Sequence, residues 1–184
     1  MRFVRHFAAF VVLTVVTAGC VEAFGTKDAH RPGEPLGTYH LVAKQASNDC
    51  GDQALGAPAT WEFDVKLSWG TGDLFWNSGG EIISGPVTEA GAFQIDTDVI
   101  EDMRTASEQG KPPCSVARHD TARGTLALTA DGDGATSAKG KLTYAFEPTT
   151  GSSCGDLVTS DAPLFAALPC AMTYTFTATR TGDY

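Results

Sequence analysis

Apolar and polar residues alternate along much of the chain, and the clearest run covers residues 61–69. Every second residue of this run is apolar, and the residues between are Glu, Asp, Lys and Ser. The apolar positions are Trp61, Phe63, Val65, Leu67 and Trp69. Successive side chains of a β-strand point to opposite faces, so this period of two places the five on one face. The pattern predicts a strand with one buried and one solvated face.

The same period occurs on both sides of a Gly/Asp cluster at residues 131–134. The alternating apolar residues are Leu126, Leu128, Leu142, Tyr144 and Phe146. Glycine and aspartate tolerate the backbone angles that tight hairpin turns require. We therefore predict an antiparallel hairpin over residues 124–148.

Further alternating or extended runs predict the remaining strands. They cover residues 37–43, 74–76, 81–84, 92–97, 114–120 and 170–180. In the last run, threonines alternate with the apolar residues Met172, Tyr174, Phe176 and Ala178. The chain thus predicts an all-β fold of roughly eight antiparallel strands with short turns, either a barrel or a sandwich. Hairpin-like connections favour the barrel.

Residues 98–110 break the alternation. Asp98 followed three residues later by Glu101 resembles a capping box, and Gly110 with the prolines after it would end a helix. One face of that helix would carry Val99, Ile100, Met103 and Ala106. This segment predicts one short surface helix. A helical turn is also predicted near residues 163–168, within an irregular insert at 149–169.

The N-terminal residues 1–19 have the layout of a secretory signal peptide. Arg2 and Arg5 precede an apolar run at residues 7–16 that is too short to span a bilayer comfortably, and small residues follow it. The segment Val16-Thr17-Ala18-Gly19-Cys20 resembles the lipobox of bacterial lipoprotein precursors. The resemblance implies that Cys20 is diacylated and becomes the mature N-terminus, which would anchor an exported protein to a membrane, facing the periplasm or the cell exterior. The alternative is ordinary cleavage after Ala23.

Three segments follow from this pattern. Residues 1–19 form the signal peptide, residues 20–36 a flexible tether with two prolines and no periodicity, and residues 37–184 one β domain. The four cysteines beyond Cys20 are Cys50, Cys114, Cys154 and Cys170. An even number in an oxidising compartment predicts two disulfides. Of the three possible pairings we favour Cys154–Cys170, which closes a local loop, with Cys50–Cys114.

Loss of residues 1–19 removes two arginines and no acidic residue, so the formal net charge changes from −9 to −11. A surface this acidic repels phosphate backbones and argues against nucleic acid as a partner. It also gives no electrostatic attraction to anionic lipid, so the acyl chains would hold the membrane alone.

Catalytic and metal-binding motifs are matched weakly. Residues 151–155 fit G-x-S-x-G, but every histidine of the chain precedes Ser153, whereas the hydrolase motif needs one after it. Asp131 and Asp133 lack the glycine and glutamate spacing of an EF-hand. We expect a plain hairpin turn there. No spacing indicates a zinc or nucleotide site, so no metal, cofactor or enzymatic activity is expected.

Arg118, His119 and Asp120, with Arg123, form the most concentrated polar cluster. Neighbouring residues of a strand point to opposite faces, so His119 and Asp120 should not meet. We interpret the cluster as a solvated strand end with an ion pair.

The inward aromatic residues either fill the interior or line a ligand cavity. They are Trp61, Phe63, Trp69, Tyr144, Phe146, Tyr174 and Phe176. A filled interior favours a membrane-anchored lipoprotein with a non-enzymatic binding or structural role. A hollow interior with one or two polar groups favours the alternative, a carrier of a small hydrophobic ligand with lipocalin-like architecture.

Overall fold

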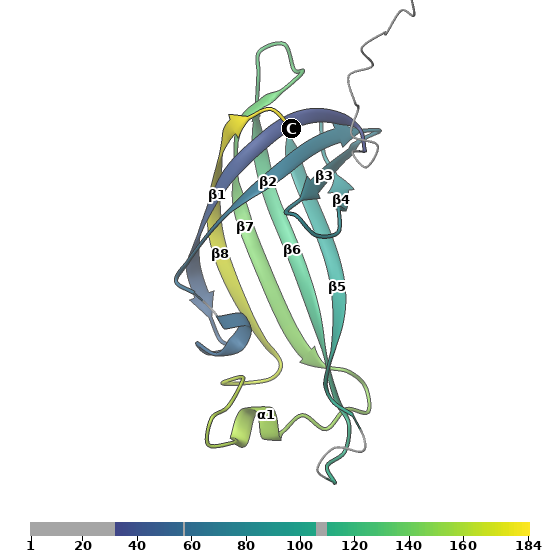
Figure 1. The fold of residues 1–184 in the computed structure, drawn as a ribbon, viewed down its shortest axis with the longest axis vertical. Coiled ribbons are helices and arrows are strands. Elements are labelled where there is room, and N and C mark those ends of the chain that lie inside the picture. Colours follow the sequence, from purple (N-terminus) through teal and green to yellow (C-terminus); the bar gives the residue numbers. More distant parts are fainter. Residues whose placement is uncertain (1–31, 57, 106–109) are drawn as a thin grey trace, which may run out of the picture.

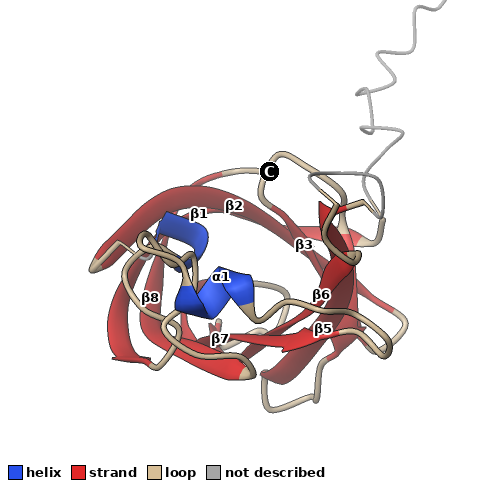
Figure 2. Ribbon diagram, turned by 90° about the horizontal axis from the view of Figure 1, so that it is seen from below, coloured by secondary structure: helices blue, strands red, loops and turns tan. Residues whose placement is uncertain are grey.

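The computed structural model describes residues 32–56, 58–105 and 110–184. They form one sheet of eight antiparallel strands that curls into a nearly closed barrel (Figures 1 and 2). The strands are β1 Glu34–Asn48, β2 Thr60–Gly70, β3 Asp73–Asn77, β4 Ile83–Pro86, β5 Ala92–Arg104, β6 Cys114–Leu128, β7 Ala135–Pro148 and β8 Cys170–Gly182. One α-helix, α1 (Asp156–Thr159), and a short 3-10 helix, η1 (Ala54–Gly56), accompany them. The predicted all-β fold is confirmed; the predicted signal peptide and lipobox lie outside the described residues.

The first and last strands meet in the middle of the sheet. The strand order is β4-β3-β2-β1-β8-β7-β6-β5, so the barrel closes where β4 approaches β5. A single bridge joins Val87 to Phe93 there. A β-carbon added to Gly85 would overlap the carbonyl oxygen of Gln94 on β5, so closure at this point requires glycine.

This closure covers only the upper half of the barrel in Figure 1, because β3 and β4 are short. The ladder between β2 and β3 covers Lys66–Gly70 of β2. Within the described residues, no strand pairs with the outer edge of β2 over 60–65, nor with that of β5 over 97–104. We call the gap between these two edges the open side. At the lower end, α1 lies across the mouth of the ring (Figure 2).

The strand alternation predicts the core correctly. Tyr39 and Leu41 of β1, Val65 and Leu67 of β2, and Tyr174 of β8 are buried. The predicted strand at 61–69 is β2, and the predicted hairpin is β6–β7, with its turn at the Gly/Asp cluster. No helix in the described ranges is long and apolar enough to cross a lipid bilayer.

Strand β1 begins at Glu34, earlier than the predicted start of the domain at residue 37. Leu36 is buried, and the Ser68 hydroxyl donates a hydrogen bond of 2.6 Å to the carbonyl of Pro32. The end of the predicted tether is therefore part of the barrel, because Leu36 supplies apolar surface to the core.

The helix predicted over residues 98–110 is wrong: residues 98–104 are the second half of β5. Each residue from Asp98 to Asp102 pairs with β6, from His119 to Ser115. This long ladder satisfies the backbone of the segment, and it outweighs the local capping signal. The α-helix among the described residues is α1. The helical turn predicted near 163–168 is wrong, because that segment has only bends and irregular backbone.

Two disulfides are present, but the favoured pairing is wrong. Cys50 pairs with Cys170, and Cys114 pairs with Cys154. The reason is strand order. The end of β1 lies beside the start of β8, which brings Cys50 to Cys170. The start of β6 lies beside the end of β7, so Cys114 meets the segment that follows β7.

Candidate functional site

A cavity of about 180 Å³ lies inside the barrel at the open side, beside residues of the β3–β4 hairpin. Its lining is mainly apolar, with a few polar groups. The lining residues are Phe63, Trp76, Ser78, Ile83, Ile95, Thr97, Asp120, Thr121, Ala122, Leu142 and Tyr144. A concave apolar site with few polar groups is the usual form of a small-molecule site.

Strand register explains why the cavity is there. Ile95, Ala122 and Leu142 are directly opposite one another on β5, β6 and β7. The small side chain of Ala122 between two large ones leaves space. The next row downward contains Thr97, Asp120 and Tyr144, which brings polar atoms to the lower edge of the cavity.

Arg118 and Asp120 form an ion pair on the inner face of β6. The Arg118 Nε atom donates to Asp120 Oδ1 at 2.8 Å and to Oδ2 at 3.1 Å. Both side chains are only about a fifth exposed (22% and 21%). Arg118 Nη1 also lies 3.9 Å from Oε1 of Glu101 on β5. A charge pair on the inner face of an aromatic barrel costs desolvation energy, which makes it a candidate for a functional role.

The charge of Asp120 also affects the pKa of the Tyr144 hydroxyl. Burial raises the pKa of Asp120, and the hydrogen bond and charge of Arg118 offset this only in part. Burial, together with the negative charge of Asp120, raises the pKa of the Tyr144 hydroxyl. Tyr144 therefore stays protonated at neutral pH. Among the described residues, no group forms a hydrogen bond with this hydroxyl.

Three aromatic rings form the wall below the cavity. Trp61 stacks on Tyr174, with ring centroids 4.9 Å apart and an interplanar angle of 14°. The Tyr144 ring meets Trp61 edge-on at 5.3 Å. Gln45 donates a long hydrogen bond of 3.4 Å to the Tyr174 hydroxyl. Such packing holds the Tyr144 ring in place while its hydroxyl remains available.

The seven aromatic residues proposed as cavity lining therefore divide into three groups. Phe63 and Tyr144 line the cavity, and Trp61 and Tyr174 form its lower wall. The others lie elsewhere. Phe146 packs against Phe165, Phe176 packs against Trp76, and Trp69 lies at the upper end of the barrel near Val87 and Leu128.

Arg118 and Asp120 were predicted to form part of a solvated strand end with an ion pair. The ion pair is present, but the solvated position is wrong, because both side chains lie on the inner face of β6. The signal for the inner face was present, because Val116, Arg118, Asp120 and Ala122 continue one period of two. In the structure Val116 and Ala122 are buried, which fixes the inward direction of the two charged residues between them.

His119 points to the outer face, as the alternation predicts, and is separated from the inward Asp120. Its Nδ1 atom is hydrogen-bonded to Asp98 Oδ1, and its Nε2 atom lies 3.3 Å from Glu147 Oε1. These hydrogen bonds, the one to Asp98 first, raise the pKa of His119. The ring is exposed and is not part of the cavity.

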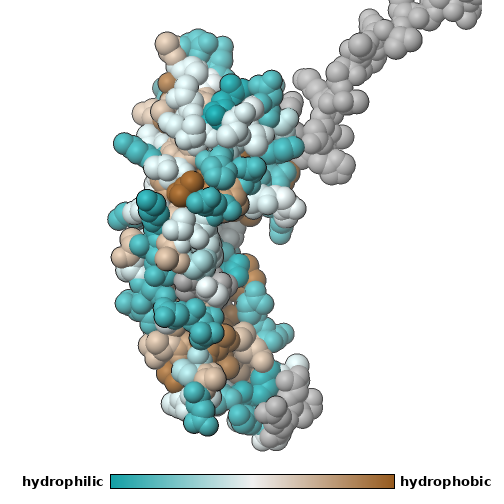
Figure 3. Space-filling view, turned by 60° about the vertical axis from the view of Figure 1, so that its left-hand side comes forward, coloured by the Kyte–Doolittle hydropathy of each residue, from teal (hydrophilic) through white to brown (hydrophobic). Residues whose placement is uncertain are grey.

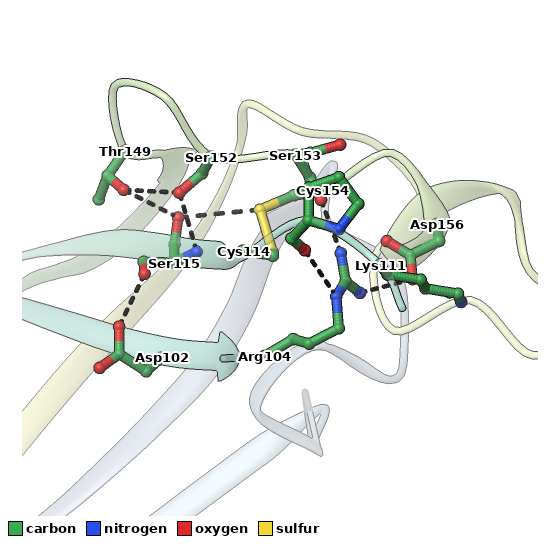
Figure 4. The surroundings of a disulfide bond; sticks show 11 residues. Asp102, Arg104, Lys111, Cys114, Ser115, Thr149, Ser152, Ser153, Cys154 and Asp156 are labelled. Atoms are coloured by element: carbon green, nitrogen blue, oxygen red, sulfur yellow. Dashed lines mark hydrogen bonds and ion pairs between the residues drawn. A yellow bond between two sulfur atoms is a disulfide. The ribbon is translucent and has the colours of Figure 1, made fainter. Parts of the chain in front are cut away.

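The residues of the two weak sequence motifs take part in a disulfide and in local hydrogen bonds. Cys154 of the G-x-S-x-G match is bridged to Cys114, and the hydroxyl of Ser152 accepts a hydrogen bond of 2.9 Å from the backbone N–H of Ser115 (Figure 4). Asp131 accepts hydrogen bonds from the Thr129 hydroxyl and the Asp133 backbone within the hairpin turn. No group of three or more metal-binding side chains gathers within the part of the chain that the structure describes.

Arg104 connects the lower loops. Its guanidinium donates to the carbonyls of Pro112 (2.9 Å) and Ser153 (2.8 Å) and to Asp156 Oδ2 (2.7 Å), as Figure 4 shows for the last two residues. Lys111 also contacts Asp156, at 3.0 Å. Beside the Cys114–Cys154 disulfide, this network holds the loops at the lower mouth in a fixed position. Sequence patterns gave no sign of it.

Few large apolar side chains are exposed on the described part of the outer surface. On the side that carries β1 and β8 in Figure 1, hydrophobic residues gather only in small patches among hydrophilic ones (Figure 3). Ile100 is the one large hydrophobic side chain that is exposed among the described residues. Comparisons with protein-family models, curated proteins and solved structures gave no match to this chain.

Proposed function

We propose that the protein is an exported, membrane-anchored lipoprotein with a non-enzymatic binding role, and that its barrel holds one small ligand. The observation that carries the binding role is the cavity at the open side, with its apolar lining and the Tyr144 hydroxyl that no described protein group engages. The anchoring rests on the signal-peptide layout and on Cys20.

The cavity volume limits the size of the ligand. Pockets for drug-sized molecules measure about 300–1,000 Å³. The cavity here, about 180 Å³, is closer to a cavity of about 150 Å³ that holds a single benzene ring. The ligand, or the end of it that enters the barrel, is therefore no larger than one substituted ring or a short branched chain.

The polar groups determine the preferred chemistry of the ligand. Asp120 accepts hydrogen bonds, and Tyr144 both donates and accepts. Arg118, Asp120 and Glu101 together carry one net negative charge. The site therefore favours an apolar body with a neutral or cationic hydrogen-bond donor, and it disfavours an anion.

Calorimetry of the mature protein with toluene, benzylamine and benzoate tests this preference. We expect benzylamine to bind most tightly and benzoate not to bind. Ala122→Leu should abolish binding, because the larger side chain fills the cavity between Ile95 and Leu142. Ala117→Leu is the matched control, because Ala117 lies on the outer face of the same strand.

Native mass spectrometry of the protein purified from its own host is the complementary measurement, since it detects a retained small molecule. If neither a retained molecule nor binding of the three probes is found, the cavity is not a ligand site. The structural or interaction role of a barrel with a filled upper half would then be the better proposal.

A further inference from the structure

The outer face of β6, β7 and β8 differs in charge from the rest of this acidic chain. These three strands contain two of the 22 acidic residues. Asp120 points inward, and Glu147 lies at the lower end of β7. The outward positions of β8 carry five threonines in succession at a period of two. They are Thr173, Thr175, Thr177, Thr179 and Thr181.

Three cationic side chains gather at the centre of this face. Arg123 of β6 lies directly opposite Lys141 of β7, and Lys139 is two residues along β7 on the same side. All three are exposed. Like charges directly opposite each other in a sheet repel, so this arrangement is unfavourable for the isolated barrel.

No carboxylate of the described residues forms an ion pair with any of these three cations. Asp96 on β5 accepts hydrogen bonds from Gln94 and Thr121, which lower its pKa. The charge of Arg123 also lowers this pKa, without an ion pair between the two residues. By contrast, Arg104 and Lys111 share Asp156 as a partner. The three central cations are thus available to an external anion.

The cations border a groove of about 940 Å³ on the outer face. Five threonines line it with them: Thr121, Thr125, Thr143, Thr175 and Thr177. Its floor is backbone at Gly124 and Gly140, which lie directly opposite each other. A β-carbon on Gly124 would lie 2.6 Å from the Lys139 carbonyl oxygen, and one on Gly140 would overlap the Arg123 carbonyl oxygen. The close approach of these strands therefore requires glycine, and no side chain separates the two strands at this point.

We infer that this groove, with Arg123, Lys139 and Lys141, binds an anionic polysaccharide. Residues two apart on a strand lie about 6.6–6.8 Å from each other, so Lys139 and Lys141 present separated charges to successive anionic groups of a polymer. Thr121 already donates to Asp96, and the hydroxyls of the other four threonines supply donors and acceptors for sugar hydroxyls between those groups. The sheet fixes the backbone positions of the set, so binding requires ordering of the side chains but no rearrangement of the strands.

A single polymer strand suits this site better than a membrane surface does. Asp96 and Asp98 of β5 and Glu147 of β7 border the face, and a flat anionic bilayer would have to approach them together with the cations. A polymer strand contacts the groove alone. Charges elsewhere on the acidic protein are screened, because the Debye length is about 8 Å at physiological ionic strength.

Calorimetry with polygalacturonate as the probe, and with neutral dextran as the blank, tests the inference on the mature protein. Polygalacturonate should bind, and Lys139→Gln/Lys141→Gln should weaken binding at least tenfold and reduce its dependence on salt. The matched pair of single variants is Lys141→Gln and Lys66→Gln, since Lys66 is an exposed lysine on the outer face of β2. Only the first should weaken binding.

Thr175→Val tests the sugar contacts, because it removes a hydroxyl and keeps the shape of the side chain. Thr175 lies directly opposite Lys141. We expect a severalfold weaker affinity for polygalacturonate and no change for polyphosphate. Equal losses from Lys66→Gln and Lys141→Gln, or no binding of polygalacturonate, would overturn the inference. So would tighter binding to polyphosphate or to vesicles of anionic phospholipid, which would assign the face to phosphate groups.

Discussion

Two tyrosines inside the barrel differ in how their hydroxyls are satisfied. The Tyr39 hydroxyl donates a hydrogen bond of 2.7 Å to the carbonyl of Ala135 and is fully buried, whereas no group among the described residues hydrogen-bonds that of Tyr144. Tyr39→Phe leaves a buried carbonyl without its partner, so we expect the free energy of unfolding to fall by about 1–3 kcal/mol. Tyr144→Phe loses no such bond, and its free energy of unfolding should stay within about 0.5 kcal/mol of the parent or rise.

Urea denaturation of both variants measures the difference. A loss for Tyr144→Phe as large as that for Tyr39→Phe would show that the Tyr144 hydroxyl has a partner in the protein. The proposed ligand contact would then lose its basis. If the contact is correct, Tyr144→Phe should also weaken benzylamine binding while leaving stability unchanged.

Protonation of His119 makes the stability of the folded protein depend on pH. Its hydrogen bonds to Asp98 and Glu147 raise its pKa above the ordinary value of 6.5. The folded state therefore holds the proton more tightly than the unfolded state does. The resulting stability is complete below pH 6.5 and is lost as the pH rises through the folded pKa.

Asp98→Asn should lower the His119 pKa more than Glu147→Gln does, because the bond to Asp98 is the larger cause. NMR titration of the imidazole protons gives both values. The pH dependence of the melting temperature above pH 6.5 should also become flatter in Asp98→Asn. An unchanged His119 pKa in that variant would contradict the observed ring geometry.

Most inward residues could be predicted from the sequence, and the charged ones could not. The aromatic positions of β2 and β8 follow from alternation, because water excludes apolar side chains from the outer face. Arg118 and Asp120 obey the same alternation, but burial of charge is so costly that charged residues indicate the solvated face by default. Their mutual hydrogen bonds reduce that cost, and such pairing depends on tertiary structure.

At the scale of elements, local and long-range signals gave different results. The hairpin and its turn were predicted correctly over residues 124–148, because the alternation and the turn residues agree, although β6 also includes the strand predicted separately at 114–120. Residues 98–104 were predicted as a helix because Asp98 and Glu101 satisfy a capping pattern. The ladder with β6, a partner that begins ten residues after β5 ends, decides the outcome. A strand at 114–120 was itself predicted, but nothing within residues 98–104 indicates that they pair with it.

The contact between β6 and β7 at Gly140 gives a sharp test of strand packing. A β-carbon there would overlap the Arg123 carbonyl oxygen, so Gly140→Ala must push the strands apart. We expect a loss of at least about 2 kcal/mol in the free energy of unfolding. Gly155→Ala is the matched control, because nothing lies within 4 Å of its β-carbon position and its φ of −58° suits alanine.

Urea denaturation compares the two variants. The control should differ from the parent by less than about 0.5 kcal/mol. A Gly140→Ala protein as stable as the control would mean that the strands are farther apart at this point than the structure has them. The groove on the outer face would then also change shape.

At the scale of the whole molecule, the disulfide pairing depends on strand order, which the sequence does not reveal. Cys50 and Cys170 are separated by 120 residues and meet only because β1 lies beside β8. Spacing along the chain favoured Cys154 as the partner of Cys170, because Cys154 is the nearest cysteine in the sequence. Even so, the cysteine count was sufficient to predict two disulfides.

Removal of either disulfide should destabilise the barrel, and somewhat more for the disulfide that closes the longer loop. The chain-entropy relation gives about 5 kcal/mol for Cys50–Cys170 and about 4 kcal/mol for Cys114–Cys154, whose separation is 40 residues. Cys50→Ala/Cys170→Ala should therefore lower the urea midpoint more than Cys114→Ala/Cys154→Ala does. Peptide mapping without reduction provides the independent check. A peptide that joins Cys154 to Cys170 would contradict the strand order.

The anchoring proposal concerns the whole molecule, because it decides how the barrel is presented to a ligand. If Cys20 carries the acyl chains, Cys20→Ala should move the protein from the membrane fraction into the soluble exported fraction, and the intact mass should lose the lipid. Cleavage after Ala23 predicts instead that the parent protein begins at Phe24, carries no lipid and is soluble already. Both disulfides should form in either case, since they require only export to an oxidising compartment. A membrane-bound Cys20→Ala protein would exclude the lipid as the anchor, and the attachment would then have to come from another part of the chain.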